Sequence, residues 1–518
     1  MTVLDINDVE TKPICKTGSK GIFPVLGIFY MVSLILVLMI WPFMGIDFAL
    51  TVGITIFTGC VLAIAVWVDS RKGRWSLIVV EKSVPVILWL FFGIGAIVAM
   101  SRPEDMRYYG AYEDSTVLLM AIYAFLGAVS YMIGFRLIYK PPTQNKPKNE
   151  YSRVSVRLAI LLVVILLFID WYMNLKLISS GLFFNWIAKI AFDTSVRGTD
   201  ILYHVQKTTT YLITPILLYL ISVSRHKKLH ILFYMGLIIL HTILIILKGD
   251  RSDLIYAGIV FVLSSALLFH LKISIKRAIQ LIVLAVLFFG ILSPVIQESR
   301  FLMRLDSESM VEDPISIPIL YITKYLPKAF SLEYILGNPS SSQRRFGFFG
   351  RMGSYMSYAV SMYQANLNGV SLRPLSELKT TLQTMIPRFL YAQKSTFDAD
   401  ALLLRHFGIG VPGQDSNGTP LADVFSFLHI YGVIGLFAIM GVGFGFVTKH
   451  LKNNYGLIGE IIVIGLFPVL LPLGDSFVGY LADLRNVMIF IGVVMVVSRF
   501  NGVLDQDVQV SPVTRRAG

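Results

Sequence analysis

Long apolar runs, separated by short polar segments, recur along almost the whole chain. A helix needs roughly 20 apolar residues to cross a hydrocarbon core about 30 Å thick, and most runs are about that long. No alternating pattern of the kind that builds a membrane barrel is seen. The pattern predicts an all-α, polytopic integral membrane protein with about twelve transmembrane helices. They are expected at residues 22–44, 47–68, 84–101, 116–139, 157–176, 209–224, 230–247, 254–271, 278–297, 424–448, 457–476 and 484–499.

Composition supports this interpretation. The chain has 518 residues, of which 55% are hydrophobic and 15% are charged, whereas soluble domains carry about 25% charged residues. The net charge of +13 could indicate nucleic-acid binding, but in a polytopic protein basic residues usually mark cytoplasmic loops. We therefore expect no nucleic-acid partner. The two cysteines, Cys15 and Cys60, are too few for a disulfide framework or a metal cluster.

Basic residues fall in alternate loops, and this sets the expected orientation. The loops that would be cytoplasmic carry Arg71, Lys72, Arg74, Lys82, Lys140, Lys146, Lys148, Arg153, Arg225, Lys227, Lys228, Lys272, Lys276, Arg277, Lys449, Lys452, Arg515 and Arg516. Short cytoplasmic loops are enriched in Lys and Arg. The pattern predicts a cytoplasmic tail at 1–21, nine helices within 22–297, a large periplasmic loop at 298–423, three helices within 424–499 and a cytoplasmic tail at 500–518.

The long loop is expected to be partly helical. Its segment SELKTTLQTMIPRFL predicts a helix that ends before Pro387, because the residue before proline disfavours the α region. FFGRMGSYMSYAVSMYQANL has the spacing of an amphipathic helix, which could lie at the membrane interface or pack against the spans.

Arginines on the expected outer face have no topological reason to be there. They are Arg197, Arg251, Arg300, Arg304, Arg344, Arg345, Arg351, Arg373, Arg388 and Arg405. A guanidinium offers a planar fork of donors that suits phosphate or carboxylate. The functional interpretation is an anion site for a lipid-linked phosphate or pyrophosphate. The alternative is that most of these arginines pair with acids of the loop or with lipid headgroups. Arg251 stands apart, because the turn LKGDRSDL fixes it between two apolar helices.

Histidines and intramembrane acids give weaker candidates. His406, in the segment DADALLLRHFGIG, could act as a general base toward an alcohol. His241 and His270 are interpreted as packing residues, whereas Asp170 and Arg136 could belong to a relay. GVGFGF, from residue 441, indicates close helix packing. No nucleotide-binding or zinc-binding motif occurs, so no cofactor and no metal are expected.

Three segments resemble the O-antigen polymerases, which join polysaccharide repeat units and are related to the O-antigen ligases. LKGDRSDL resembles the family's Gly-Asp/Ser-Arg turn at the outer end of a span. IPRFLYAQKSTFD resembles its Pro-Arg-aromatic…Lys element late in the outer loop. TPLADVFSFLHIYGVIGLF resembles its acidic residue followed by an aromatic helix, with Asp423 where the family often has Glu.

The resemblance implies a metal-independent glycosyltransferase of the bacterial inner membrane with a periplasmic active site. Its donor and acceptor would be oligosaccharides linked to undecaprenyl pyrophosphate. A chain-length regulator and a flippase would be further partners. The pyrophosphate would be bound by Arg251, Arg388, Arg197, Arg351 and Lys394, with His406 or Asp423 as the base.

Two other functions remain open at this point. An O-antigen ligase would use the same clamp chemistry with a lipid A–core saccharide as acceptor. A transporter or flippase of lipid-linked saccharides would favour inverted repeats, broken helices and charges buried between spans. The sequence shows no convincing internal symmetry, and its unexplained charges gather on one expected face, which favours the transferase.

Overall fold

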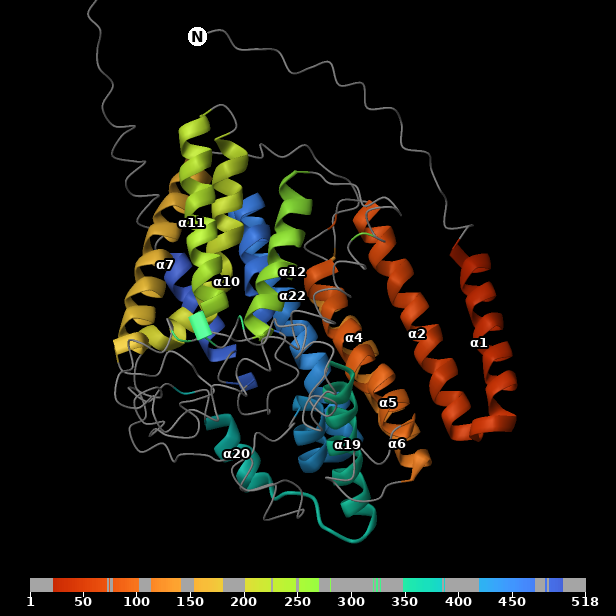
Figure 1. The fold of residues 1–518 in the computed structure, drawn as a ribbon. Coiled ribbons are helices and arrows are strands. Elements are labelled where there is room, and N and C mark those ends of the chain that lie inside the picture. The colour runs from red at the N-terminus through yellow and green to blue at the C-terminus, as the bar shows by residue number, and fades with distance from the viewer. Residues whose placement is uncertain are drawn as a thin grey trace, which may run out of the picture.

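The structure is a computed structural model in which all regular elements of the described residues are helices (Figure 1). The described residues are 22–71, 74, 78–101, 113–140, 153–179, 201–224, 227–247, 251–269, 280, 320, 323–324, 327, 348–383, 386, 419–470, 480–481 and 484–496. Six of the described helices are long and apolar enough to cross a membrane. They support a polytopic membrane protein, while the number of twelve spans stays a prediction.

The helices of the N-terminal half follow the apolar runs. They are α1 (Ile22–Met44), α2 (Ile46–Arg71), α4 (Ser83–Leu88), α5 (Gly95–Ser101), α6 (Asp114–Ile138), α7 (Arg153–Ser179), α10 (Ile201–Val223), α11 (Lys228–Leu247) and α12 (Arg251–Leu268). Only Gly45, with φ +85°, separates α1 from α2, so these two helices form a tight hairpin. The span expected at 278–297 lies outside the described residues apart from residue 280.

The third apolar run forms a longer and less regular helix than the sequence indicates. Helical structure begins at Ile78, not at residue 84, and two π-helical segments, η2 (Ile78–Lys82) and η3 (Trp89–Ile94), flank α4. Lys82 is therefore not part of a cytoplasmic loop. It lies inside the helix and is 4% exposed. Lys82 can be buried because its ammonium group pairs with the carboxylate of Glu81.

In the C-terminal half, α22 (Pro420–Leu470) contains the predicted span 424–448 and residues 457–470 of the next, whose residues 471–476 lie outside the described part of the chain. Its helical conformation is interrupted at His429 (φ 55°, ψ −149°) and at Gly456 (φ 58°, ψ −127°). A side chain at Gly459 would meet the backbone carbonyl of Leu451, so the chain folds back closely on itself around Gly456. A further apolar helix is described at Leu484–Val496.

Glycines allow α22 to pack directly against α6. Side chains added at Gly441 and Gly134 would collide with the carbonyl oxygens of Tyr131 and Ala438 on the opposite helix. One added at Gly445 would come within 2.9 Å of the Phe135 carbonyl oxygen. Small residues let membrane helices approach this closely. The close packing predicted for GVGFGF is confirmed.

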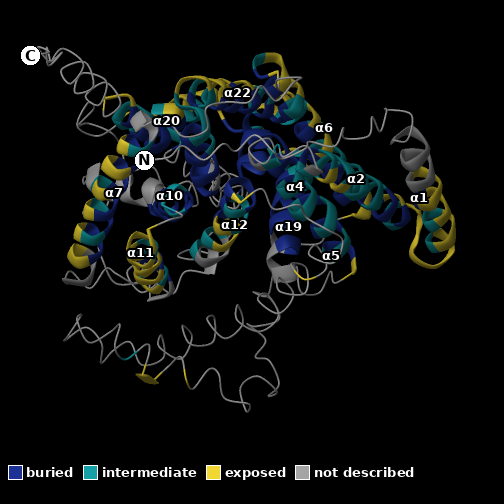
Figure 2. Cartoon of the chain, turned by 90° about the horizontal axis from the view of Figure 1, so that it is seen from above, coloured by how far each residue is buried: buried dark blue, intermediate teal, exposed yellow. Residues whose placement is uncertain are grey.

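The two expected loop helices behave differently. α19 (Phe348–Leu367) packs against α5 and η3 and buries Met352, Met356 and Tyr358, so it lies against the spans and not alone at the interface. Figure 2 shows buried residues gathered where α4, α6, α19 and α22 meet. α20 (Leu375–Gln383) ends before Pro387, as the sequence indicates, and leaves Leu375 and Leu382 exposed.

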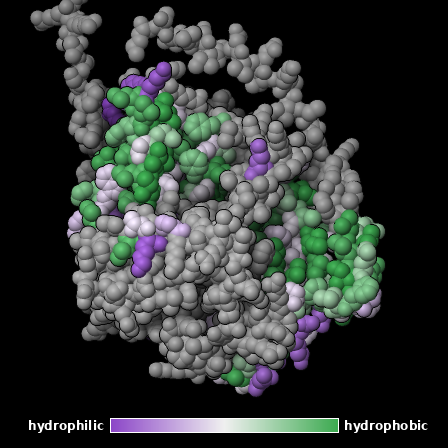
Figure 3. Space-filling model, in the orientation of Figure 1, coloured by the Kyte–Doolittle hydropathy of each residue, from purple (hydrophilic) through white to green (hydrophobic). Residues whose placement is uncertain are grey.

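The outer helices expose large apolar side chains. Leu232 and Phe233 of α11 are 69% and 62% exposed, and Met39 and Phe43 of α1 are 63% and 85% exposed. Figure 3 shows the corresponding hydrophobic patches over the α10–α11 region and over the α1–α2 hairpin. Apolar patches of this kind are rare on soluble monomers and fit contact with lipid.

Candidate functional site

Arg251 is the first residue of α12, immediately after the three-residue connection from α11. The positive end of the helix dipole lies there, so a cation at this position does not favour the helix. Asp253, in the same turn, does favour it. The placement of Arg251 therefore calls for another explanation, and binding of an anion is one.

A hydrogen bond fixes the start of α12 to α10. The hydroxyl of Tyr211 donates to Oδ1 of Asp253, and the Tyr211 ring lies edge-on to Tyr256 with centroids 6.1 Å apart. Tyr211 is 8% exposed. Neighbouring helices thus hold the backbone that carries Arg251, as a binding site requires.

A second cluster of polar side chains is buried where α7, α10 and α11 meet. Nδ1 of His241 is 3.2 Å from Oδ2 of Asp170, and the Thr210 hydroxyl donates to Oδ1 of Asp170 at 3.1 Å. Nε2 of His241 is 2.8 Å from the Thr210 carbonyl oxygen. All three residues are buried. The interpretation of His241 as a packing residue is incomplete, because its ring is paired with an acid.

Asp423 lies in the first turn of α22 and is 2% exposed. Thr419 caps this turn, since its hydroxyl accepts from the Ala422 N–H at 3.1 Å. The Ser426 hydroxyl donates to the Asp423 carbonyl oxygen at 2.5 Å. Asp423 therefore belongs to the packed beginning of the helix, where a carboxylate also favours the dipole.

Arg373 joins α20 to this part of α22. Its backbone N–H donates to the Ser426 carbonyl oxygen at 2.9 Å, and its guanidinium lies 4.2 Å from the centroid of the Phe427 ring. Nε donates to Glu377 at 3.0 Å. For this arginine, which is 3% exposed, the alternative of pairing with an acid of the loop is confirmed.

The remaining predicted site residues are not brought together by the described part of the structure. His406, Arg197, Arg388 and Lys394 lie outside the described residues, and Arg351 is placed only by its position in α19. Among the residues that are described, no group of three or more His, Cys, Asp or Glu side chains could hold a metal ion.

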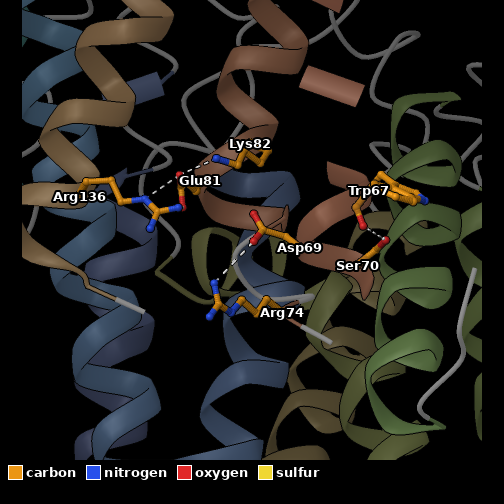
Figure 4. A network of polar contacts seen from close by, with 7 residues as sticks. All are labelled: Trp67, Asp69, Ser70, Arg74, Glu81, Lys82 and Arg136. Atoms are coloured by element: carbon orange, nitrogen blue, oxygen red, sulfur yellow. Dashed lines mark hydrogen bonds and ion pairs between the residues drawn. The ribbon is translucent and has the colours of Figure 1, made fainter. Parts of the chain in front are cut away.

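A charge cluster at the C-terminal end of α6 was missed by sequence reasoning (Figure 4). Oε1 of Glu81 accepts from Lys82 at 2.6 Å and from Nε of Arg136 at 2.8 Å, and Oε2 of Glu81 lies 2.7 Å from a second guanidinium nitrogen of Arg136. Arg74 lies 3.9 Å from Asp69 beside them. Arg136 is thus an ion-pair partner of Glu81. The adjacency of Glu81 and Lys82 before an apolar run was a usable signal, but their partner 55 positions away was not.

Comparison of the chain with protein-family models, with curated proteins and with solved structures finds no match.

Proposed function

We propose that the chain is a membrane glycosyltransferase that polymerises undecaprenyl-pyrophosphate-linked oligosaccharide repeat units at the periplasmic face of the bacterial inner membrane. The main support is the place of Arg251, at the start of an apolar helix whose first turn is held by Tyr211 and Asp253. A guanidinium at the end of such a helix suits a pyrophosphate that emerges from the bilayer.

The proposed reaction needs no external energy source, because the donor is already activated. The acceptor hydroxyl oxygen attacks the anomeric carbon of the donor, and the bond from that carbon to the pyrophosphate oxygen breaks. Negative charge develops on the leaving pyrophosphate, which Arg251 and Arg388 would stabilise, assisted by Arg197, Arg351 and Lys394. The hydroxyl proton passes to a base.

His406 is the preferred base in this proposal. A near-neutral imidazole is suited to accept the hydroxyl proton. Asp423 is 2% exposed, and it lies in a capped helical turn. That environment favours a role for Asp423 in positioning the start of α22 over direct proton transfer from a substrate.

Lipopolysaccharide from a deletion strain tests the proposal. A polymerase predicts core carrying a single repeat unit in the mutant, with long chains restored by the wild-type gene. Core without any repeat, together with accumulated lipid-linked polymer, would instead assign the O-antigen ligase reaction. Unchanged chain length in a strain without a second copy of the activity would contradict both.

A transporter of lipid-linked saccharides is the second candidate, because two kinds of observation favour it. Asp170, Glu81 and Lys82 are charged groups buried between helices, and the helix at 78–101 is interrupted by two π-helical segments. Buried ionisable residues and irregular spans are common in transporters. This function predicts that the deletion strain retains repeat-bearing lipid on the cytoplasmic side only, a result that separates it from both transferases.

A further inference from the structure

We propose that α20 lies in the interface between the bilayer and water, with its apolar side turned toward the acyl chains of the lipids. This side, the apolar stripe, is formed by Leu375, Leu378, Leu382 and Ile386. The contact with the membrane is independent of the proposed transfer reaction. Two observations support it: the distribution of side chains around α20, and the place at which this helix is attached to α22.

The apolar stripe follows from the helical repeat. Its four residues are spaced by three, four and four positions, so they share one side of a helix with 3.6 residues per turn. α20 ends at Gln383, and the N–H of Ile386 donates to the Gln383 carbonyl oxygen at 3.0 Å, which keeps Ile386 close to the end of the helix. Leu378 is half-buried, whereas the other three residues of the stripe are exposed. The sequence therefore gives this short helix one narrow apolar side.

α20 turns its polar side to the protein. Arg373, Glu377 and Thr381 are four positions apart, and Arg373 and Thr381 are 3% and 1% exposed. Nε of Arg373 donates to the Glu377 carboxylate at 3.0 Å, and the Thr381 hydroxyl donates to the Glu377 carbonyl oxygen at 2.8 Å. Leu375 and Leu382, in contrast, are 60% and 46% exposed. A surface helix of a soluble domain buries its apolar side. The reverse arrangement of α20 calls for an apolar surrounding outside the protein.

Arg373 attaches the start of α20 to the first turns of an apolar helix. Its backbone N–H donates to the Ser426 carbonyl oxygen at 2.9 Å, and its guanidinium lies 4.2 Å from the centroid of the Phe427 ring. The apolar stretch of α22 begins at Pro420, so Ser426 lies only about 9 Å along the helix axis from that end. α20 begins two residues after Arg373, at the end of the molecule where α19 also lies (Figure 1). This is the level at which a bilayer that surrounds α22 would end.

The interfacial region of a bilayer suits α20 in length and in side chains. A helix of nine residues is too short to cross the hydrocarbon core. Short helices with one apolar side and otherwise polar residues instead lie in the plane of the interface. Lys379, which is exposed beside the apolar stripe, can reach the phosphates of the headgroups while its carbon chain follows the apolar side. We therefore assign lipid as the partner of this surface.

The contact would hold the segment that leads into α22 at a fixed depth. Arg373 joins α20 to Ser426, and Asp423 lies one turn before Ser426 on the same helix. A lipid surface that binds α20 therefore also positions the buried start of α22.

Spin labels on the purified full-length protein in lipid nanodiscs test the contact. In a variant without Cys15 and Cys60, a nitroxide is attached to Leu375→Cys or to Leu382→Cys, and its collisions with oxygen and with a water-soluble nickel chelate are measured by electron paramagnetic resonance. Oxygen concentrates among acyl chains, whereas the chelate stays in water. We expect both labels to collide several-fold more often with oxygen, and several-fold less often with nickel, than a label at Asn368→Cys, an exposed position before α20.

Ser376→Cys is the matched control on the helix itself, because Ser376 is exposed but lies off the apolar stripe. Its label should be more accessible to nickel than the two labels on the stripe. Nickel accessibility at Leu375 and Leu382 as high as at Asn368 would mean that the stripe faces water, and would overturn the proposal. Weak collisions with both reagents would mean that protein covers the stripe, for example a second copy of the chain, and would equally overturn it. Since both leucines are exposed, neither substitution removes a packed side chain. The measurement needs no enzymatic activity, so its outcome is separate from that of the proposed function.

Discussion

Glu81 binds two cations, Lys82 and Arg136, although it is only 1% exposed. Glu81→Gln leaves Lys82 buried without a compensating charge, and breaking a buried ion pair from one side costs about 3–5 kcal/mol. We expect a marked fall in the thermal unfolding midpoint. Glu81→Gln/Lys82→Met should recover most of it, because the buried Asp69 keeps Arg74 at 3.9 Å and the side chain of Arg136 is 42% exposed.

Lys228→Met is the matched control for that comparison, because Lys228 is exposed. It should leave the free energy of unfolding within about 0.5 kcal/mol of the wild type, and the midpoint nearly unchanged. A Glu81→Gln protein as stable as this control would mean that the charges of the cluster are not coupled.

Arg251 allows a test of the proposed pyrophosphate clamp by a pair of substitutions. Arg251→Ala should abolish polymer while the protein still accumulates in the membrane. Arg251→Lys should also be poor, because an ammonium cannot reproduce a bidentate fork. Chain-length profiles of lipopolysaccharide measure the effect, with Arg157→Ala, an exposed arginine of α7, as control. Normal polymer in Arg251→Ala would remove this residue from the site.

The base is tested by turnover of purified protein on lipid-linked repeat units. A positioned base typically contributes about 10²–10⁴ in rate, so His406→Ala should lose activity on this scale and still bind donor lipid. Asp423→Asn should be milder, because Asp423 is buried in the first turn of α22. The reverse ranking would assign the base to the carboxylate, and activity in both variants would show that no base is needed.

Sequence reasoning recognised single residues but not their partners. Asp170 stood out because an acid inside an apolar run is costly, yet nothing along the chain indicates that His241, on another helix, lies against it. Arg373 appeared as one of many outer arginines; its pair with Glu377 is local, four positions along the chain, whereas its contact with Phe427 depends on how α20 meets α22. Such pairings are products of tertiary packing, which local patterns do not contain.

At the scale of elements, the contact of α6 with α22 depends on glycines. Gly441→Ala places a methyl group against the Tyr131 carbonyl, and overpacking of this kind costs about 1–3 kcal/mol. Gly443→Ala is the matched control on the same helix, since nothing lies within 4 Å of a side chain there. We expect a lower unfolding midpoint for the first variant and an unchanged or slightly higher one for the second. Equal midpoints would contradict this description of the packing.

Element positions could be predicted where length and apolarity decide them. The helices α2, α6, α7, α11 and α12 enclose or closely match the apolar runs, because each run is long enough to form a complete helix. The π-helical segments could not be predicted, because they depend on the packing of the helix at 78–101 against α2, α6 and α19.

For the whole molecule, the orientation is the prediction to test. In a variant without Cys15 and Cys60, a cysteine at Asn368 should react with an impermeant maleimide in intact spheroplasts. A cysteine at Asn453 should react only after lysis. Both positions are exposed, and they lie in the segments expected to be periplasmic and cytoplasmic, respectively. Labelling with the opposite pattern would reverse the model of the membrane topology.

The candidate site as a whole could be predicted only in part from the sequence. The turn at Arg251 could be located because charged residues between two apolar helices are conspicuous. Its attachment through Tyr211 and Asp253 could not, because these residues are 42 positions apart. A site assembled from distant segments is defined by the fold, whereas its residue types are visible in the chain.

The α1–α2 hairpin also bears on how the protein is made. Among the described helices α1 packs mainly on α2, and the single residue Gly45 joins them. Because they contact each other directly, the two helices can enter the bilayer together, before the helices that follow them in the chain have been synthesised. If both helices span the membrane, as the sequence predicts, loss of the complete hairpin preserves the parity of membrane crossings, whereas loss of one helix alone would place every later loop on the opposite side. Deletions in this region should therefore be tolerated when they remove both helices of the hairpin.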